Sequence, residues 1–216
     1  MAYRQLPVLG VNLGRLGFLA DLRPDQVRSC FPQVVRGQYR LTHHLMYECV
    51  VDDGTKPQTY LGLNEIVIRS APPFRMLDLE VVLDDGPVAH FSGDGLIVST
   101  PIGSTAHSLS AGGPILAQEL QAFVITPLCP HTLTFRPVVE SADRTYTIRL
   151  ERADTQATLV IDGQDAIPLT PAHRLSLRRA PVAFTLVKVP GHSFYQTLRD
   201  KLHWGAPPLY RSEPPG

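Results

Sequence analysis

Net charge, a metal-binding cysteine pattern and a long apolar run are all missing from this sequence. The 20 basic and 20 acidic residues cancel, so nothing draws the surface as a whole toward nucleic acid or an anionic membrane. Cys30, Cys49 and Cys129 show no zinc-ligand spacing and are typical of reduced thiols in the cytoplasm. No apolar run reaches the roughly 18 residues of a membrane span, and the N-terminus lacks a secretory pattern. We therefore expect a cytoplasmic protein that binds neither nucleic acid, nor a membrane, nor a metal through side chains of its own.

The sequence contains enough apolar residues to form a hydrophobic core, since 44% of its 216 residues are hydrophobic. Short apolar or β-branched runs alternate with polar turns between residues 38 and 188, which is typical of a sandwich-like β domain. Strands are expected at residues 39–53, 63–70, 77–91, 95–100 and 175–189, with three more between residues 135 and 169. The third of these stretches is expected to be a hairpin around Asp85-Gly86.

The segments on either side of the β region have a different pattern. Residues 1–37 contain an apolar strand, Pro7–Val11, a glycine-rich turn (NLGRLG), and a helix opened by Pro24 with apolar residues at a 3.6-residue period. Residues 189–216 contain a short amphipathic helix, with Ser193 as its N-cap, and a tail. We expect a mainly β protein, α+β overall, whose two outer segments are parts of one further α/β domain.

The stretch FSGDGLIVSTPIGSTAHSLSAGGP, residues 91–114, contains an expected buried strand, GLIVST. A long run of glycine and hydroxyl-bearing residues comes after this strand. The SGDG turn of the stretch presents backbone amides and the carboxylate of Asp94, and its glycines let a ligand come close. Thr100, Ser104 and Thr105 add hydroxyls suited to ribose and phosphate, and the ring of His107 can stack on a base. An ordinary glycine-rich turn would explain SGDG alone, whereas the whole stretch favours a nucleotide-binding loop.

A serine hydrolase would use the same residue types, here Ser104, His107 and Asp94. GSTAH, however, is not a GxSxG elbow, and a serine three residues before a histidine is not a known nucleophile–base arrangement. The pattern therefore disfavours this activity.

Three shorter stretches could add to a nucleotide site: Asn64-Glu65, Asn12–Phe18 and Ile161–Gln164. In the first, an amide can hold a ribose or a base edge and a carboxylate can orient a hydroxyl, although an ordinary turn would also explain the pair. The second follows the expected strand and is a partial phosphate-loop pattern, weak by itself. The third contains an Asp-Gly turn, which between strands is usually only a hairpin.

In their order along the chain, GVNLGRLGFLADL, LNEIVI, the 91–114 stretch, IDGQ and SFYQTLRDKLHW resemble the NAD kinases, over about residues 7–204. These enzymes phosphorylate the 2′-hydroxyl of the adenosine ribose of NAD to give NADP. The resemblance implies an N-terminal α/β domain, a C-terminal β domain, and a terminal segment that returns to the first domain. It also implies ATP or polyphosphate as phosphoryl donor, a divalent metal such as Mg²⁺, and a homodimer or homotetramer.

The resemblance further implies a set of residues that contact NAD. These residues are Asn64, Glu65, Asp94, Thr105, Ala106, His107 and Ser110. Additional candidates for nucleotide contacts are Asn12, Gly14, Phe18, Gly163 and Gln164.

Two features depart from the family. The family commonly has tyrosine where this chain has His107, which keeps a ring but makes its charge depend on pH. The family's GGDG motif, whose aspartate accepts the ribose proton and whose glycines cradle the donor phosphates, has no counterpart here. Because phosphoryl transfer depends on positioning and charge stabilisation, we expect a truncated NAD kinase with impaired catalysis.

Two alternatives remain. The first is a non-catalytic NAD(P)-binding or regulatory remnant, which the missing GGDG motif suggests. The second is a related lipid kinase of the diacylglycerol or sphingosine type, which the GSTAHSLSAGGP string and the Asn–Glu pair disfavour.

Overall fold

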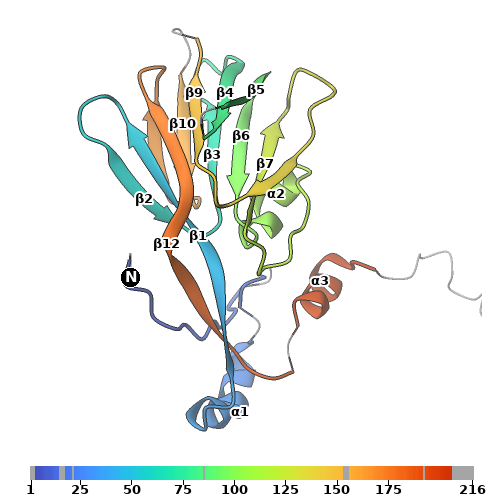
Figure 1. Ribbon diagram of the computed structural model, residues 1–216. Coiled ribbons are helices and arrows are strands. Elements are labelled where there is room, and N and C mark those ends of the chain that lie inside the picture. The colour runs from blue at the N-terminus through green and yellow to red at the C-terminus, as the bar shows by residue number, and fades with distance from the viewer. Residues whose placement is uncertain are drawn as a thin grey trace, which may run out of the picture. The chain divides into compact units, whose positions relative to one another are not determined.

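Strands are the main regular secondary structure of the computed structural model, which describes residues 3–14, 18–20, 22–84, 86–152, 156–191 and 193–205. The helices within these ranges are short: α1 (Pro24–Val35), α2 (His107–Ser110), α3 (Phe194–Leu202) and the 3₁₀ turn η1 (Gly103–Thr105). The prediction of a mainly β protein is confirmed (Figure 1). None of the helices in the described part of the chain is long and apolar enough to cross a membrane.

The strands form two six-stranded sheets. The first has the order β2 (Gln58–Gly62), β1 (Arg40–Asp52), β12 (Arg174–Lys188), β9 (Tyr146–Leu150), β4 (Leu77–Leu83) and β5 (Gly86–Gly93). The second has the order β11 (Asp165–Leu169), β10 (Ala157–Ile161), β3 (Glu65–Ser70), β6 (Gly95–Ser99), β7 (Ala122–Leu128) and β8 (Val138–Ser141). In the second sheet β3 pairs antiparallel with both β6 and β10.

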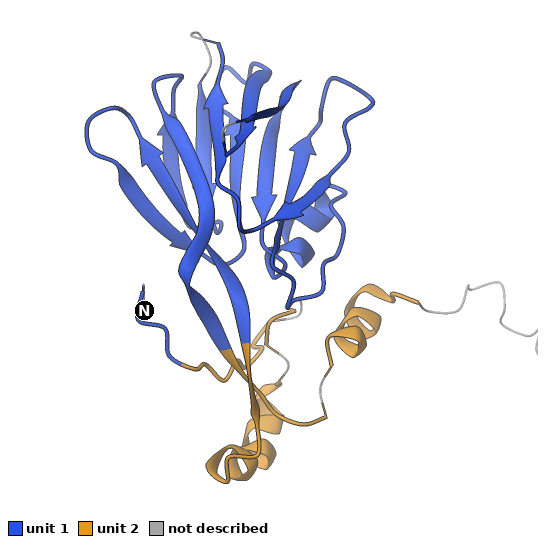
Figure 2. Ribbon diagram, in the orientation of Figure 1, with its two compact units in different colours: residues 1–6, 43–185 blue, residues 7–42, 186–216 orange. Residues whose placement is uncertain are grey.

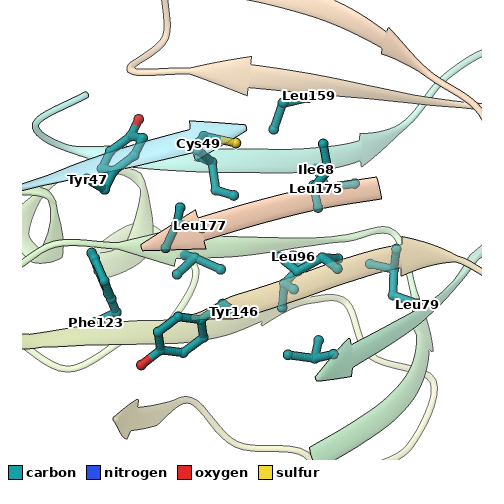
Figure 3. Close-up of a cluster of buried hydrophobic side chains, with 14 of the residues drawn as sticks. Tyr47, Cys49, Ile68, Leu79, Leu96, Phe123, Tyr146, Leu159, Leu175 and Leu177 are labelled. Atoms are coloured by element: carbon teal, nitrogen blue, oxygen red, sulfur yellow. The ribbon is translucent and has the colours of Figure 1, made fainter. Parts of the chain in front are cut away.

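The inner faces of the two sheets share one hydrophobic core. Strand β4 alternates buried and half-buried residues, as expected when one face of a strand points inward. The core joins Leu79 and Leu177 from the first sheet to Ile68, Leu96 and Leu159 from the second (Figure 3). This shared core makes the β region the sandwich that the sequence predicts.

Tyr146 ties the core to the backbone just before its own strand. Its side chain is fully buried, and its hydroxyl donates a 2.6 Å hydrogen bond to the carbonyl of Ser141. We expect Tyr146→Phe to lower the free energy of unfolding by about 1 kcal/mol, because it leaves a half-buried carbonyl without this donor. Tyr60→Phe is the matched control, since the partner of the Tyr60 hydroxyl among the described residues is the exposed Gln58 side chain. Equal urea midpoints for the two variants would contradict this expectation.

Several strands differ from the sequence prediction. The region from residue 135 to 169 forms four strands, β8 to β11, where three were expected, because each needs only four or five residues. Strands β2 and β7 were not predicted. Strand β7 contains Pro127, which has no N–H and usually argues against an inner strand, yet it pairs with Leu96 near the strand's end.

The chain divides into two compact units, residues 1–6 with 43–185 and residues 7–42 with 186–216 (Figure 2). Unit 1 is the sandwich with η1 and α2. Unit 2 contains α1 and α3, so the segments before and after the β region belong to the same unit. Of the three cysteines, Cys30 and Cys49 are buried, Cys129 is exposed, and all are free thiols.

Within unit 2 the helices follow the sequence prediction and the strand does not. Ser193 accepts the Gln196 N–H at the start of α3, as an N-cap should. The expected strand Pro7–Val11 is reduced to two isolated bridges, Val8 with Leu186 and Val11 with Leu22. A strand needs a continuous partner to form a ladder, and each bridge here extends over one residue pair. Part of the expected glycine-rich turn, residues 15–17, lies outside the described residues.

Candidate functional site

The Asn64-Glu65 pair lies at the start of β3, and its backbone is held by Asp162. Asp162 belongs to the turn between β10 and β11, where both it and Gly163 have positive φ, 47° and 70°. Its carboxylate accepts the N–H of Leu63 at 2.6 Å, of Asn64 at 2.9 Å and of Glu65 at 3.0 Å. The hairpin turn that the sequence predicts at Asp162 therefore has a second task, which is to fix the backbone of the pair.

Tyr47, on β1, completes this network from the other sheet. Its hydroxyl lies 2.8 Å from Asp162 Oδ1 and 2.8 Å from the Glu65 carbonyl oxygen, and its proton can be donated to either. The Asp162 N–H also donates to the Glu65 carbonyl at 2.9 Å. A β-carbon on Gly62 would overlap the Tyr47 ring, so glycine is needed where β2 ends. Sequence reasoning missed the part played by Tyr47, because nothing along the chain shows that β1 passes this turn.

The Glu65 carboxyl group is buried beside another carboxylate. The residue is 7% exposed, and its Oε2 is buried and has no hydrogen-bond partner among the described residues. Burial first, and then the negative charge of Asp162, raise the pKa of Glu65 to about 7. An acceptor without a donor is costly in a folded protein, so this oxygen is suited to accept hydroxyls from a ligand.

The loop after β6 packs directly on the Asn64-Glu65 backbone. The Asn64 carbonyl accepts the Thr100 N–H at 2.9 Å, and the Thr100 hydroxyl donates to the Leu63 carbonyl at 2.5 Å. A β-carbon on Gly103 would overlap the Asn64 carbonyl, so η1 can approach only because this residue is glycine. The structure thus brings two predicted motifs together, the Asn–Glu pair and the long loop (Figure 1).

The hydroxyls of the loop do not face a ligand as the sequence suggested. Thr100, Ser104 and Thr105 are all buried, and each donates to a backbone carbonyl: of Leu63, Pro101 and Ile102 respectively. They shape the loop instead, because a buried hydroxyl must find an acceptor. Ala106, His107 and Ser110 are exposed and form the accessible part of the motif.

The geometry also disagrees with a serine hydrolase. Ser104 is fully buried, its hydroxyl donates to the Pro101 carbonyl at 2.7 Å, and its oxygen accepts the Leu116 N–H at 3.0 Å. His107 is exposed, and no hydrogen bond joins its ring to Ser104 in the described structure. A nucleophilic serine needs a base within reach, so the geometry is as unfavourable to this activity as the sequence.

Asp94 lies at the far end of β6 from the Asn–Glu pair. Glu65 pairs with Ser99 and Arg69 with Gly95, so within unit 1 Asp94 and Glu65 are separated by about 17 Å along the strand. Asp94 is exposed, and its carboxylate accepts a hydrogen bond from the Cys129 thiol that raises the pKa of that thiol. The single chain therefore does not bring Asp94 together with the other predicted NAD contacts.

The remaining candidates lie elsewhere. Gly163 and Gln164 are exposed in the β10–β11 turn, beside Asp162. Asn12, Gly14 and Phe18 belong to unit 2, where the Asn12 side chain accepts the Gly14 N–H at 3.0 Å.

Unit 2 also contains a cavity of about 870 Å³, lined in part by Asn12, Gly14 and Lys201. Phe18 is buried, and Lys201 Nζ lies 5.5 Å from the centre of its ring. Within the described residues no group of three or more His, Cys, Asp or Glu side chains is placed to hold a metal ion.

Comparison with known proteins gives a consistent result. The sequence model of the ATP-NAD kinase C-terminal domain matches residues 63–189. An NAD kinase of Rhodopirellula baltica is 45% identical over 94% of this chain and 66% of its own. Two solved structures are similar to 93% of the chain: a yeast NADH kinase complexed with NADH (24% identity, TM-score 0.84) and an NAD kinase from Archaeoglobus fulgidus in complex with ATP (27% identity, TM-score 0.79). The chain spans 60% of the yeast protein and 75% of the archaeal one.

Proposed function

Because the chain belongs to the NAD kinase family, we propose that it forms the NAD-binding part of an enzyme that phosphorylates the adenosine-ribose 2′-hydroxyl of NAD to give NADP. The observation that carries this proposal is the buried Glu65 carboxyl group, whose Oε2 has no donor among the described residues. The loop that packs on the Asn64-Glu65 backbone adds an exposed rim of Ala106, His107 and Ser110. Two carboxylate oxygens and an amide provide acceptors for ribose hydroxyls and a donor for ring or amide oxygens.

Each residue has a distinct role in this proposal. The carboxylate of Glu65 accepts ribose hydroxyls, and the Asn64 side chain bonds the nicotinamide side of the ligand. His107 stacks against a flat ring or donates to it, and Ser110 offers a hydroxyl at the same rim. Thr105 acts through its backbone, because its hydroxyl is already donated to the Ile102 carbonyl.

The reaction is a phosphoryl transfer from ATP or polyphosphate. With ATP, the ribose oxygen forms a bond to the γ-phosphorus, the bond from that phosphorus to the β–γ bridging oxygen breaks, ADP leaves, and a base accepts the hydroxyl proton. No residue of this chain is assigned as that base, since its sequence contains no GGDG motif. A divalent metal would neutralise charge on the phosphates, and the proposal gives it no protein ligand in this chain. The archaeal relative in complex with ATP supports ATP as donor.

We further propose a domain organisation and an assembly. Unit 1 is the NAD-binding β domain, and unit 2 is part of an α/β domain to which residues 189–216 return. The active form is a homodimer or homotetramer in the cytoplasm. Asp94, Gly163 and Gln164 in unit 1, and Asn12, Gly14 and Phe18 in unit 2, are kept as ligand contacts of that assembly.

Titration calorimetry with NAD tests the binding part. At about pH 8, where the Glu65 carboxyl is ionised, we expect a dissociation constant between about 1 µM and 1 mM, a range usual for enzyme substrates. Asn64→Ala should weaken binding about tenfold, whereas Gln38→Ala, which removes an exposed amide outside the site, should leave it unchanged. If the folded chain does not bind NAD, the proposal is contradicted. Lipid-dependent ATP turnover would then favour the lipid-kinase alternative.

An NADP assay tests the catalytic part. A form of the protein that carries the family's GGDG segment before these residues is expected to make NADP from NAD, ATP and Mg²⁺. If this chain binds NAD but the longer form makes no NADP, the proposed kinase activity is refuted, and the chain is a module that only binds NAD.

A further inference from the structure

We infer that Asp162 is a positioning residue of the NAD site, which holds the Leu63–Glu65 backbone and keeps a negative charge beside the Glu65 carboxyl group. The inference rests on the proposed function, because it concerns how Asn64 and Glu65 are presented to NAD. Asp162 itself is not expected to touch the ligand.

Hydrogen bonds within the protein occupy most of the Asp162 carboxylate. Its two oxygens receive the N–H groups of Leu63, Asn64 and Glu65 and face the hydroxyl of Tyr47. Oδ1 faces the Asn64 and Glu65 N–H groups and the Tyr47 hydroxyl, and Oδ2 accepts the Leu63 N–H. An ionised carboxylate offers about four acceptor positions, so groups of the protein occupy most of the Asp162 side chain.

The same bonds fix the direction of the Asn64 and Glu65 side chains. Three successive N–H groups pointing at one carboxylate define the backbone of the turn, and the Asp162 N–H closes it by donating to the Glu65 carbonyl at 2.9 Å. From the other side, Thr100 holds the Leu63 and Asn64 carbonyls. The backbone N–H and C=O groups of Asn64 and Glu65 are thus all hydrogen-bonded within the protein. The two side chains are the parts left to contact a ligand.

The charge of Asp162 acts on Glu65 as well as on the backbone. Within the described part of the chain, the groups that face Glu65 are Asp162 from the β10–β11 turn, Tyr47 from β1, and on β6 the uncharged Ser99. With burial, the charge of Asp162 raises the pKa of Glu65 to about 7. Because ribose hydroxyls donate best to the ionised form, NAD binding should strengthen as pH rises through about 7 and weaken below it.

Asp162→Asn tests both parts of this inference. Asparagine tolerates the positive φ of this turn but can accept at only one oxygen. NAD titrations of wild type and variant between about pH 5.5 and 8.5 should show about tenfold weaker binding at the upper end. Removing the neighbouring negative charge should also lower the pKa of Glu65, so the midpoint of the pH dependence should move to lower pH. A residue with only a structural role would weaken binding without moving that midpoint.

The controls separate the possible failures. Asp165→Asn makes the same chemical change in the exposed neighbouring position and should alter neither value. If wild type does not bind NAD, the proposed function fails; if it binds and Asp162→Asn matches it in affinity and midpoint, this inference fails. Should Asp162→Asn not fold, Tyr47→Phe removes one donor and keeps the charge. It is then expected to weaken binding about threefold at an unchanged midpoint, and unaltered affinity would overturn the inference.

Discussion

Replacing Glu65 with glutamine is expected to weaken NAD binding about 100-fold at pH 8 and to remove the rise in affinity that ionisation of this carboxyl group causes near pH 7. The amide keeps the shape of the carboxyl group but puts an NH₂ donor where one oxygen accepted a ribose hydroxyl, and it has no charge to strengthen the remaining bond. It cannot ionise, so the rise in affinity through about pH 7 disappears with the carboxyl group. Titration calorimetry at several pH values measures both effects.

The same substitution should change stability in the opposite direction. The folded-state pKa of Glu65 is raised from 4.5 to about 7, so the folded protein binds this proton more tightly than the unfolded chain. Stability therefore falls as pH rises between these two values, by on the order of 3 kcal/mol in total. Glu65→Gln should avoid this loss and unfold at higher urea concentration than wild type at pH 8, with little difference at pH 4.

Glu119→Gln is the matched control for both measurements. Glu119 is exposed, and the substitution should leave binding and stability close to wild type. If Glu65→Gln bound NAD as well as wild type, the buried carboxyl group would have no part in binding, and the proposed site would be wrong.

Gly103→Ala is expected to disrupt the site by forcing two backbones apart. The new β-carbon would overlap the Asn64 carbonyl and approach the Ser99 hydroxyl at 2.7 Å. Because the obstacle is backbone, either η1 or the Asn64-Glu65 turn must move, and the Thr100–Asn64 hydrogen bond between them is lost or stretched. We expect about 4 kcal/mol less stability and NAD binding too weak to measure by calorimetry.

Gly86→Ala provides the comparison. A β-carbon there meets nothing closer than the Leu83 carbonyl oxygen at 3.9 Å, an ordinary contact. Urea unfolding and NAD titration of the two variants side by side isolate the close approach from the general cost of replacing glycine. Gly103→Ala with wild-type stability and affinity would show that the loop does not depend on contact with Asn64.

The resemblance placed the Asn–Glu pair and the long loop in one site. The pairing of two neighbouring strands explains why they are in contact. Strands β3 and β6 are neighbours, so the start of one lies beside the end of the other. Asp94 shows the limit of the same approach. Motif order along the chain groups Asp94 with the rest of the loop. However, the five residues of β6 lie between them, so Asp94 is at one end of this strand and the loop is at the other.

By itself the sequence determined the mainly β class, the two flanking helices and the family, because periodicity, turn residues and motif strings act locally along the chain. Only the tertiary structure decided which polar groups remain free. Thr100, Ser104 and Thr105 look like ligand contacts until their backbone carbonyl partners are known. Asp162 looks like a hairpin residue until three N–H groups, about 100 positions earlier, are seen to point at it. A hydrogen-bonding group is satisfied by whatever folding brings near it, and for these residues the partner lies on another strand or within a newly formed turn.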